Sequence, residues 1–116
     1  MAEQKTYIFF YKCLTSKELQ RRILKKSNFI LIDLTGTYKG NKYRIQGATT
    51  IPYPEVIDRR KELRHYDEII LYTTNKNCDA ARKRAVGLHL IGFDNVLVYD
   101  AGLDDWTAHN LPVEEY

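Results

Sequence analysis

The sequence has 116 residues, of which 44% are hydrophobic and 28% charged, and 18 Lys and Arg against 15 Asp and Glu leave a net charge of +3. At this length, folding buries roughly 65% of the surface of the unfolded chain, enough for one hydrophobic core without disulfides or metals. These values exclude a disordered, collagen-like or disulfide-stapled chain. We expect a single domain over residues 1–116, with a short N-terminal extension over about residues 1–12.

The N-terminal region and the cysteines indicate the compartment. The apolar run over residues 7–11 is too short for a signal-peptide core or a membrane span, so we expect no membrane association. Cys13 and Cys78 are then expected to be free thiols of a reducing cytoplasm, with Cys13 as a small apolar filler. The basic residues are scattered rather than gathered in one stripe, which argues against nucleic acid as a partner.

The first elements along the chain are a helix and a buried strand. Thr15 and Glu18 have the spacing of a capping box, which predicts an amphipathic helix that runs through Leu19, Ile23 and Leu24 and ends near Ser27. The continuous apolar run over residues 29–32 then stops at a carboxylate, Asp33. Such a run is typical of a parallel strand that is covered on both faces.

The remaining elements alternate between loops, helices and strands. Residues 35–43 predict a loop and residues 44–52 a turn into a short extended piece, and Pro54 starts a helix to about Leu63. Two further buried strands are predicted over residues 69–72 and 96–99. Helices are predicted after each of them, the first carried by Ala81, Ala85, Leu88 and Ile91 and the second around Trp106. The alternation predicts an α/β fold with a mostly parallel central sheet flanked by helices on both faces.

In such a sheet, ligands bind beyond the carboxyl ends of the strands, which points to residues 33–36, 73–78 and 100–102. The middle segment is a polar loop between a strand and a helix N-terminus. Its backbone N–H groups and the helix dipole predict an anion-binding loop. That loop consists of Thr73, Thr74, Asn75, Lys76, Asn77 and Cys78.

Several segments, taken together, resemble a single-domain rhodanese from about Leu14 to Glu114. They are the strand that ends in Asp33, the stretch from Arg44 to Ala48 with Ile51 and Pro52, residues 72–81, residues 92–96, Ala101 and Gly102 with Trp106, and residues 111–114. The resemblance implies a three-layer rhodanese-like fold and a sulfurtransferase scaffold, in which a cysteine at the first loop position carries sulfur as a persulfide. Asp33 and Arg44 take supporting positions beside the loop.

The sequence departs from the rhodanese pattern at the chemical centre. Thr73 stands at the nucleophile position, and a hydroxyl cannot carry a persulfide sulfur. Arg44 replaces the usual His and Thr35 a frequent Arg. Lys76 replaces a loop glycine, where left-handed backbone would cost a lysine roughly 1 kcal/mol. We therefore expect a degenerate site that lacks the usual thiosulfate sulfurtransferase activity and binds a small oxyanion or a protein partner.

Cys78 is the alternative reactive group. The helix N-terminus and the cations of Lys76 and Arg82 would favour its thiolate, which would make the protein a sulfur carrier or a redox protein. Burial under the helix is the expected alternative for this cysteine. A third hypothesis is an interaction module that uses the loop over residues 35–43, with Tyr38 and Tyr43. The dispersed histidines predict no metal site, and the sequence predicts no cofactor.

Overall fold

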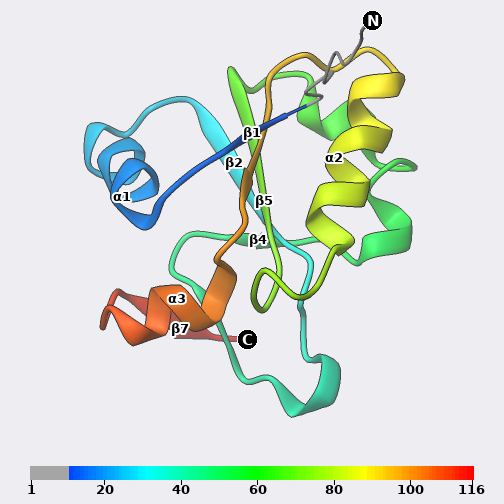
Figure 1. Cartoon of the computed structure of the whole chain (residues 1–116). Helices are drawn as coiled ribbons and strands as arrows, with labels where there is room; N and C mark the ends of the chain where they lie inside the picture. The colour runs from blue at the N-terminus through cyan, green and yellow to red at the C-terminus, as the bar shows by residue number, and fades with distance from the viewer. Residues whose placement is uncertain (1–10) are drawn as a thin grey trace, which may run out of the picture.

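The computed structural model describes residues 11–116 and contains a five-stranded parallel sheet (Figure 1). Its strands are β1 (Lys12–Cys13), β2 (Phe29–Asp33), β4 (Thr49–Thr50), β5 (Glu68–Tyr72) and β6 (Val96–Tyr99), in the order β1-β6-β5-β2-β4. A second, antiparallel pair is formed by β3 (Tyr43–Ile45) and β7 (Val113–Glu115). Most of the apolar run over residues 7–11 lies outside the described residues.

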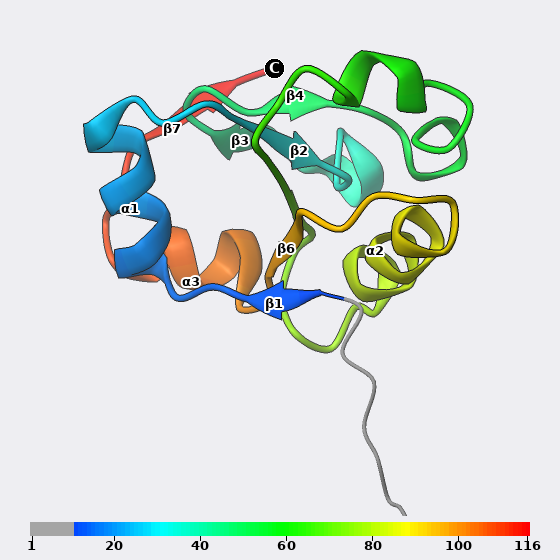
Figure 2. The ribbon, with the colours of Figure 1, turned by 90° about the horizontal axis from the view of Figure 1, so that it is seen from above.

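Helices cover both faces of the sheet, as predicted (Figure 2). On one face lie α1 (Ser16–Lys25) and α3 (Gly102–Ala108). On the other lie α2 (Ala80–Leu90) and the 3-10 turns η2 (Tyr53–Glu55) and η3 (Arg60–Leu63). Alternate strand residues feed the two cores: Ile69 and Leu71 pack toward α2, while Ile70 and Tyr72 pack toward α1 and α3. This arrangement confirms the predicted three-layer α/β fold.

The buried strands end at the same level. Asp33 pairs in register with Tyr72, and Tyr72 pairs with Tyr99, and all three side chains are fully buried. The segments that follow β2, β5 and β6 therefore emerge side by side at one edge of the sheet. This is the edge at which the sequence predicted a ligand site.

The first helix is confirmed with its cap, but not with its whole apolar face. The Thr15 hydroxyl accepts a hydrogen bond from the Glu18 N–H, and the Glu18 carboxylate accepts one from the Thr15 N–H, so the capping box is complete. Leu19 is buried, whereas Ile23 is 37% and Leu24 82% exposed, so the prediction that these two face the core is wrong. In the C-terminal half of the helix the contact with the sheet is polar: Arg22 forms an ion pair with Glu68 of β5 at 2.7 Å.

The helix predicted from Pro54 to Leu63 is also wrong: the segment forms the two separate turns η2 and η3. Most of its hydrogen bonds span three residues, as from the Glu55 N–H to the Pro52 carbonyl. Only Val56 and Leu63 are fully buried, so few contacts favour a continuous α-helix here. No helix within residues 11–116 has the length and apolar character that crossing a bilayer requires.

The strands β1, β3 and β7 were not predicted as strands, because each has only two or three residues and no apolar alternation of its own. The structure also corrects the role of Cys13. Both residues of β1 are exposed, because this strand lies at the edge of the sheet and pairs only with β6. Cys13 is therefore not an apolar filler.

Candidate functional site

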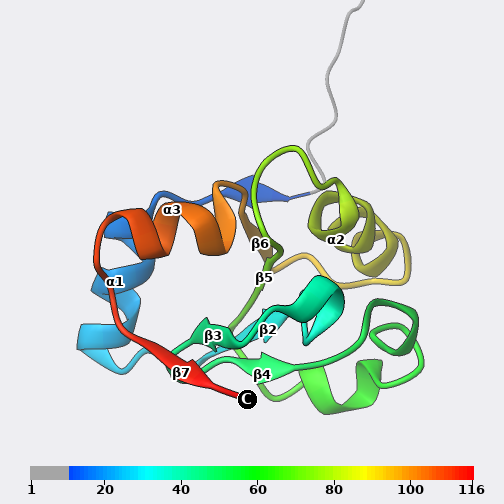
Figure 3. The same cartoon turned by 90° about the horizontal axis from the view of Figure 1, so that it is seen from below.

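A pocket of about 670 Å³ lies at the carboxyl edge of the sheet. One wall comes from residues 34–41 after β2, which include the short helix η1 (Tyr38–Gly40). The other wall comes from the loop after β5 and the first residue of α2, and Leu103 and Asp104 of α3 complete the lining. Figure 3 views the molecule from this edge. The pocket brings together Thr73, Thr74, Asn75, Asn77 and Cys78 of the predicted anion-binding loop.

Thr73 forms the buried base of this loop, with 5% of its surface exposed. Its carbonyl accepts a hydrogen bond from the Leu103 N–H at 2.9 Å, and the Thr74 carbonyl accepts one from the Asp104 N–H at 2.8 Å. Gly102 makes this contact possible: it has a φ of +71°, and a Cβ there would lie 2.5 Å from the Thr73 oxygen. These two backbone hydrogen bonds therefore fix the base of the loop to the start of α3.

The middle of the loop is an internal turn built by Asn75. Its side-chain oxygen accepts from the Asn77 N–H at 2.9 Å, and its backbone carbonyl accepts from the Cys78 N–H at 3.1 Å. This turn leaves the N–H groups of Thr74 and Lys76 out of its hydrogen bonds. Lys76 is not among the residues with left-handed backbone, so the strain expected from its replacing a glycine does not arise.

The start of α2 is open toward the pocket. Asp79, the N-cap residue directly before the helix, makes no capping hydrogen bond with its side chain and instead pairs with Lys83 at 3.3 Å. Arg82 forms an ion pair with Asp100 and donates a hydrogen bond to the Lys76 carbonyl at 3.1 Å. The charge of Arg82, which was expected to act on Cys78, is thus compensated by Asp100.

Cys78 is exposed and lines the pocket, so the expectation of a buried cysteine under the helix is wrong. The reason is the orientation of α2, which packs against the sheet through Ala81, Ala85 and Leu88. Cys78 lies before the first turn of the helix, on the side of the loop that faces solvent.

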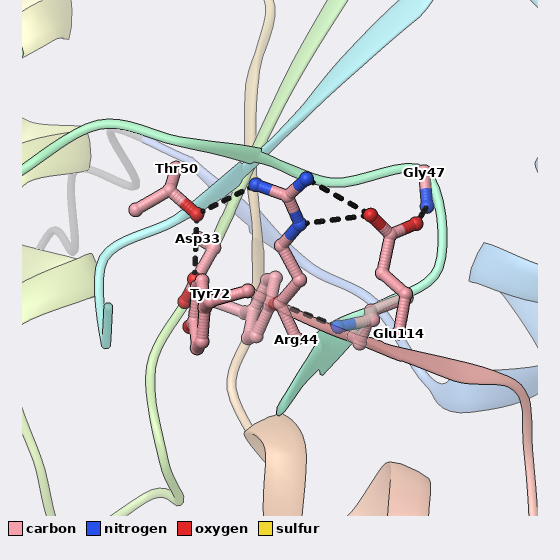
Figure 4. A network of polar contacts seen from close by, with 8 residues as sticks. Asp33, Arg44, Gly47, Thr50, Tyr72 and Glu114 are labelled. Atoms are coloured by element: carbon pink, nitrogen blue, oxygen red, sulfur yellow. Dashed lines mark hydrogen bonds and ion pairs between the residues drawn. The ribbon is translucent and has the colours of Figure 1, made fainter. Parts of the chain in front are cut away.

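Asp33 lies at the centre of a network of polar contacts beside the pocket (Figure 4). Its side chain is fully buried, and one carboxyl oxygen accepts a hydrogen bond from the Thr35 N–H at 2.8 Å. The other oxygen accepts from the Thr50 hydroxyl at 3.0 Å and from the Tyr116 hydroxyl. Asp33 therefore braces the loop that forms one wall of the pocket.

Arg44 belongs to the same network and does not line the pocket. It donates two hydrogen bonds to the Glu114 carboxylate, at 2.9 and 3.1 Å, and one to the Thr50 hydroxyl at 3.0 Å (Figure 4). The other Glu114 oxygen accepts from the Gly47 N–H at 2.8 Å. These backbone and Arg44 contacts hold the pKa of Glu114 below its usual value. Arg44 supports the site indirectly, through Thr50 and Asp33.

Two tyrosines complete the network, and the sequence did not identify either. The Tyr72 hydroxyl accepts a hydrogen bond from the Ile45 N–H at 2.9 Å, and burial raises the pKa of Tyr72. The Tyr116 hydroxyl donates to Asp33 and accepts from the Asn41 side chain at 3.2 Å. Burial and the hydrogen bond to Asp33 raise the pKa of Tyr116, which keeps its proton available for that bond. Only the pairing of β3 with β7 brings Tyr116 here, and no local pattern signals it.

Within residues 11–116, no group of three or more His, Cys, Asp or Glu side chains is placed to hold a metal ion. The polar groups of the site instead belong to the loop backbone, to hydroxyls and amides, and to the Asp33 network. Chemically, the arrangement presents hydrogen-bond donors, the start of a helix and one exposed thiol to a shared pocket.

The family model of the rhodanese-like domain matches residues 15–109. The chain therefore belongs to the rhodanese-like domain family. Comparison with curated proteins gives no match.

Solved structures share the fold. A Bacillus halodurans protein is 26% identical, with a TM-score of 0.78 over 90% of this chain and 77% of that one. A rhodanese-related protein from Thermoplasma volcanium is 21% identical, with a TM-score of 0.70 over 90% of this chain and 98% of that one. A thiosulfate sulfurtransferase from Pseudomonas aeruginosa is 18% identical, with a TM-score of 0.74, and the match covers 90% of this chain and 20% of that one.

The joint between Gly102 and Thr73 can be tested by adding a single methyl group. Gly102→Ala combines left-handed backbone with a Cβ placed 2.5 Å from the Thr73 oxygen. Gly40→Ala is the matched control, because Gly40 has a φ of +77° and no atom within 4 Å of the added Cβ. Urea unfolding should show a loss of about 1–2 kcal/mol for Gly40→Ala. The loss should be clearly larger for Gly102→Ala, with amide NMR shifts at Thr73 and Thr74. Equal losses would contradict a backbone joint at this position.

Proposed function

We propose that this rhodanese-like domain lacks the usual thiosulfate sulfurtransferase activity and binds a small oxyanion in the pocket at residues 73–78. The observation that carries the proposal is the position of Thr73, which forms the buried base of a loop that opens on the pocket together with the start of α2. The scaffold of the family is present, and the nucleophile of its chemistry is not.

The chemistry at position 73 supports the first half of the proposal. Transfer of sulfur from thiosulfate needs a thiolate that attacks the outer sulfur and releases sulfite, so that a persulfide remains on the protein. A threonine hydroxyl stays protonated at neutral pH and is a poor nucleophile without an adjacent base. The pocket lining holds no histidine that could serve as that base.

The charges and donors around the pocket support the second half. The first N–H groups of α2 have no intrahelical partners, and the positive end of an 11-residue helix favours an anion there. Lys39 lines the opposite wall. The carboxylates close by are already engaged: Asp104 accepts from the Asn75 side chain at 2.9 Å, and Asp79 pairs with Lys83.

Replacing the threonine tests the missing nucleophile. The native protein should show no turnover of thiosulfate with cyanide, whereas Thr73→Cys should gain one sulfur atom from thiosulfate, a shift of about 32 Da by mass spectrometry. Thr74→Cys is the matched control, one residue further along the same loop, and should gain none. Native turnover typical of an active rhodanese would overturn this half of the proposal.

Titration with sulfate tests the anion site. Amide NMR shifts should be confined to residues 73–80, and the binding should weaken with added sodium chloride, because exposed charges are screened by salt. Lys76→Gln should weaken binding about two- to threefold, in line with the removal of one exposed charge. Lys61→Gln, an exposed lysine on η3, should leave it unchanged. Amides of residues 74–80 that do not respond would contradict an oxyanion site.

The exposure of Cys78 supports a second candidate function, a sulfur carrier or redox protein that acts through this thiol. Cys78 opens on the pocket from a position next to the start of α2. Thiols near helix N-termini are more reactive than isolated thiols, because the dipole stabilises the thiolate.

Alkylation separates this candidate from the first, with Cys13 as the internal reference. Cys13 is also exposed, but partial burial and the charge of Asp100 raise its pKa. Iodoacetamide at pH 7 should therefore modify Cys78 several times faster than Cys13, as followed by peptide mass spectrometry on the folded protein. Cys78→Ser and Cys13→Ser assign the two rates. Equal rates, or a slower Cys78, would remove the thiol-based candidate.

Binding of a protein partner stays a prediction, and the surface expected to bind it is the loop over residues 35–43. Tyr38 is 71% and Tyr43 43% exposed on the loop and strand that follow β2, the surface expected for an interaction module.

We propose a cytoplasmic location on the basis of the two free thiols.

A further inference from the structure

A second pocket, of about 420 Å³, lies next to the anion-binding pocket. The two pockets share Leu34, Thr35 and Tyr38 in their linings, so they lie next to each other along this segment. The second pocket has a different character. Three tyrosines, Tyr38, Tyr53 and Tyr116, line it together with Pro52. No part of the proposed oxyanion binding uses this second space.

Two of the three tyrosine rings are held in place by contacts with arginine side chains. The Arg84 guanidinium lies 3.9 Å from the centre of the Tyr53 ring, and the Arg44 guanidinium lies 5.7 Å from that of Tyr116. The Tyr116 hydroxyl is also bonded to Asp33 and Asn41. Aromatic walls that are fixed before binding lose little conformational entropy when a ligand arrives.

Tyr38 forms the third wall and is held less tightly. It is 71% exposed, and it lies between Gly36 and Gly40, which have φ values of +57° and +77°. Such a side chain can cover a flat ligand at the junction of the two pockets. The aromatic lining therefore suits a planar ring, which stacks on or meets the edges of tyrosine rings at centroid distances of 4.5–7 Å.

We propose that the ligand of this site is an aromatic oxyanion, whose ring occupies the tyrosine-lined pocket while its anionic group binds at residues 73–78. This inference rests on the proposed oxyanion site and names the class of molecule that it takes. An aromatic pocket alone also suits cations. Here Arg84 and Lys39 already place positive charge against the rings of Tyr53 and Tyr38, and this favours an anion.

The carboxyl group of Asp33 does not oppose such a ligand directly. It is fully buried, and it already accepts hydrogen bonds from Thr35, Thr50 and Tyr116. Thr37 also lines the second pocket, and its hydroxyl can bond a polar substituent on the ring.

The test compares 2-naphthalenesulfonate, inorganic sulfate and neutral 2-naphthol as ligands of the full chain, by calorimetry and amide NMR. We expect 2-naphthalenesulfonate to bind at least tenfold more tightly than either of the other two. Its NMR shifts should extend from residues 73–80 to Tyr53 and Tyr116, whereas those from sulfate should not.

Tyrosine variants locate the ring. Tyr38→Ala and Tyr53→Leu should each weaken 2-naphthalenesulfonate about three- to tenfold, the size of one aromatic contact. Tyr53→Leu should also leave sulfate binding unchanged, because Tyr53 lines the second pocket and not the first. Tyr43→Ala is the matched control, because Tyr43 is a partly exposed tyrosine that lines neither pocket. Tyr38 is largely exposed, so its variant tests the ring site even if Tyr53→Leu alters folding.

The outcomes separate this inference from the proposed function. If sulfate binds and the naphthalene ring adds no affinity, the aromatic ligand is overturned and the oxyanion site stays intact. The same holds if the ring adds affinity that the tyrosine variants do not reduce. Equal binding of 2-naphthol and 2-naphthalenesulfonate overturns the anionic part of the ligand. Binding of none of the three overturns both the inference and the proposed function.

Discussion

The architecture of the site depends on one buried carboxyl group, that of Asp33. A carboxyl group removed from water at the end of a strand must find hydrogen-bond donors, because leaving it unpaired costs several kcal/mol. Its donors come from three separate parts of the chain: the loop directly after β2, the parallel strand β4, and Tyr116 after β7. Satisfying this one group therefore fixes the positions of three segments that are distant in sequence.

The opposite wall of the pocket depends on a different kind of contact. Backbone carbonyls of Thr73 and Thr74 accept from the first N–H groups of α3, and the close approach is possible because Gly102 has no side chain. These N–H groups would otherwise be unpaired at the helix start. The two hydrogen bonds thus pair the first N–H groups of α3 and position the loop. They use backbone atoms, so they form whatever side chain stands at position 73.

The sequence predicted those features that depend on local pattern. The three buried strands were found almost at their observed bounds because both of their faces are covered, which produces continuous apolar runs. The capping box of α1 was found because its two residues are three apart. The meeting of the loops after β2, β5 and β6 at one edge of the sheet was also predicted, since parallel strands open their carboxyl ends on the same side.

The features that the sequence did not predict depend on contacts between distant segments. Whether Leu24 faces the core is decided by where α1 leaves the sheet, and whether Cys78 is exposed is decided by which side of α2 packs. The partner of Arg44 is Glu114, which lies 70 residues away and arrives through the pairing of β3 with β7. Apolar spacing alone carries no information on such pairings.

The two walls of the pocket are thus built independently of the side chain at position 73. One wall is held by the Asp33 network and the other by backbone hydrogen bonds through Gly102, and neither uses the side chain of Thr73. The side chain at position 73 can therefore change while the backbone hydrogen bonds that hold this wall remain. The same independence explains how the rhodanese-like fold over residues 15–109 and the pocket at its sheet edge are compatible with a threonine at position 73.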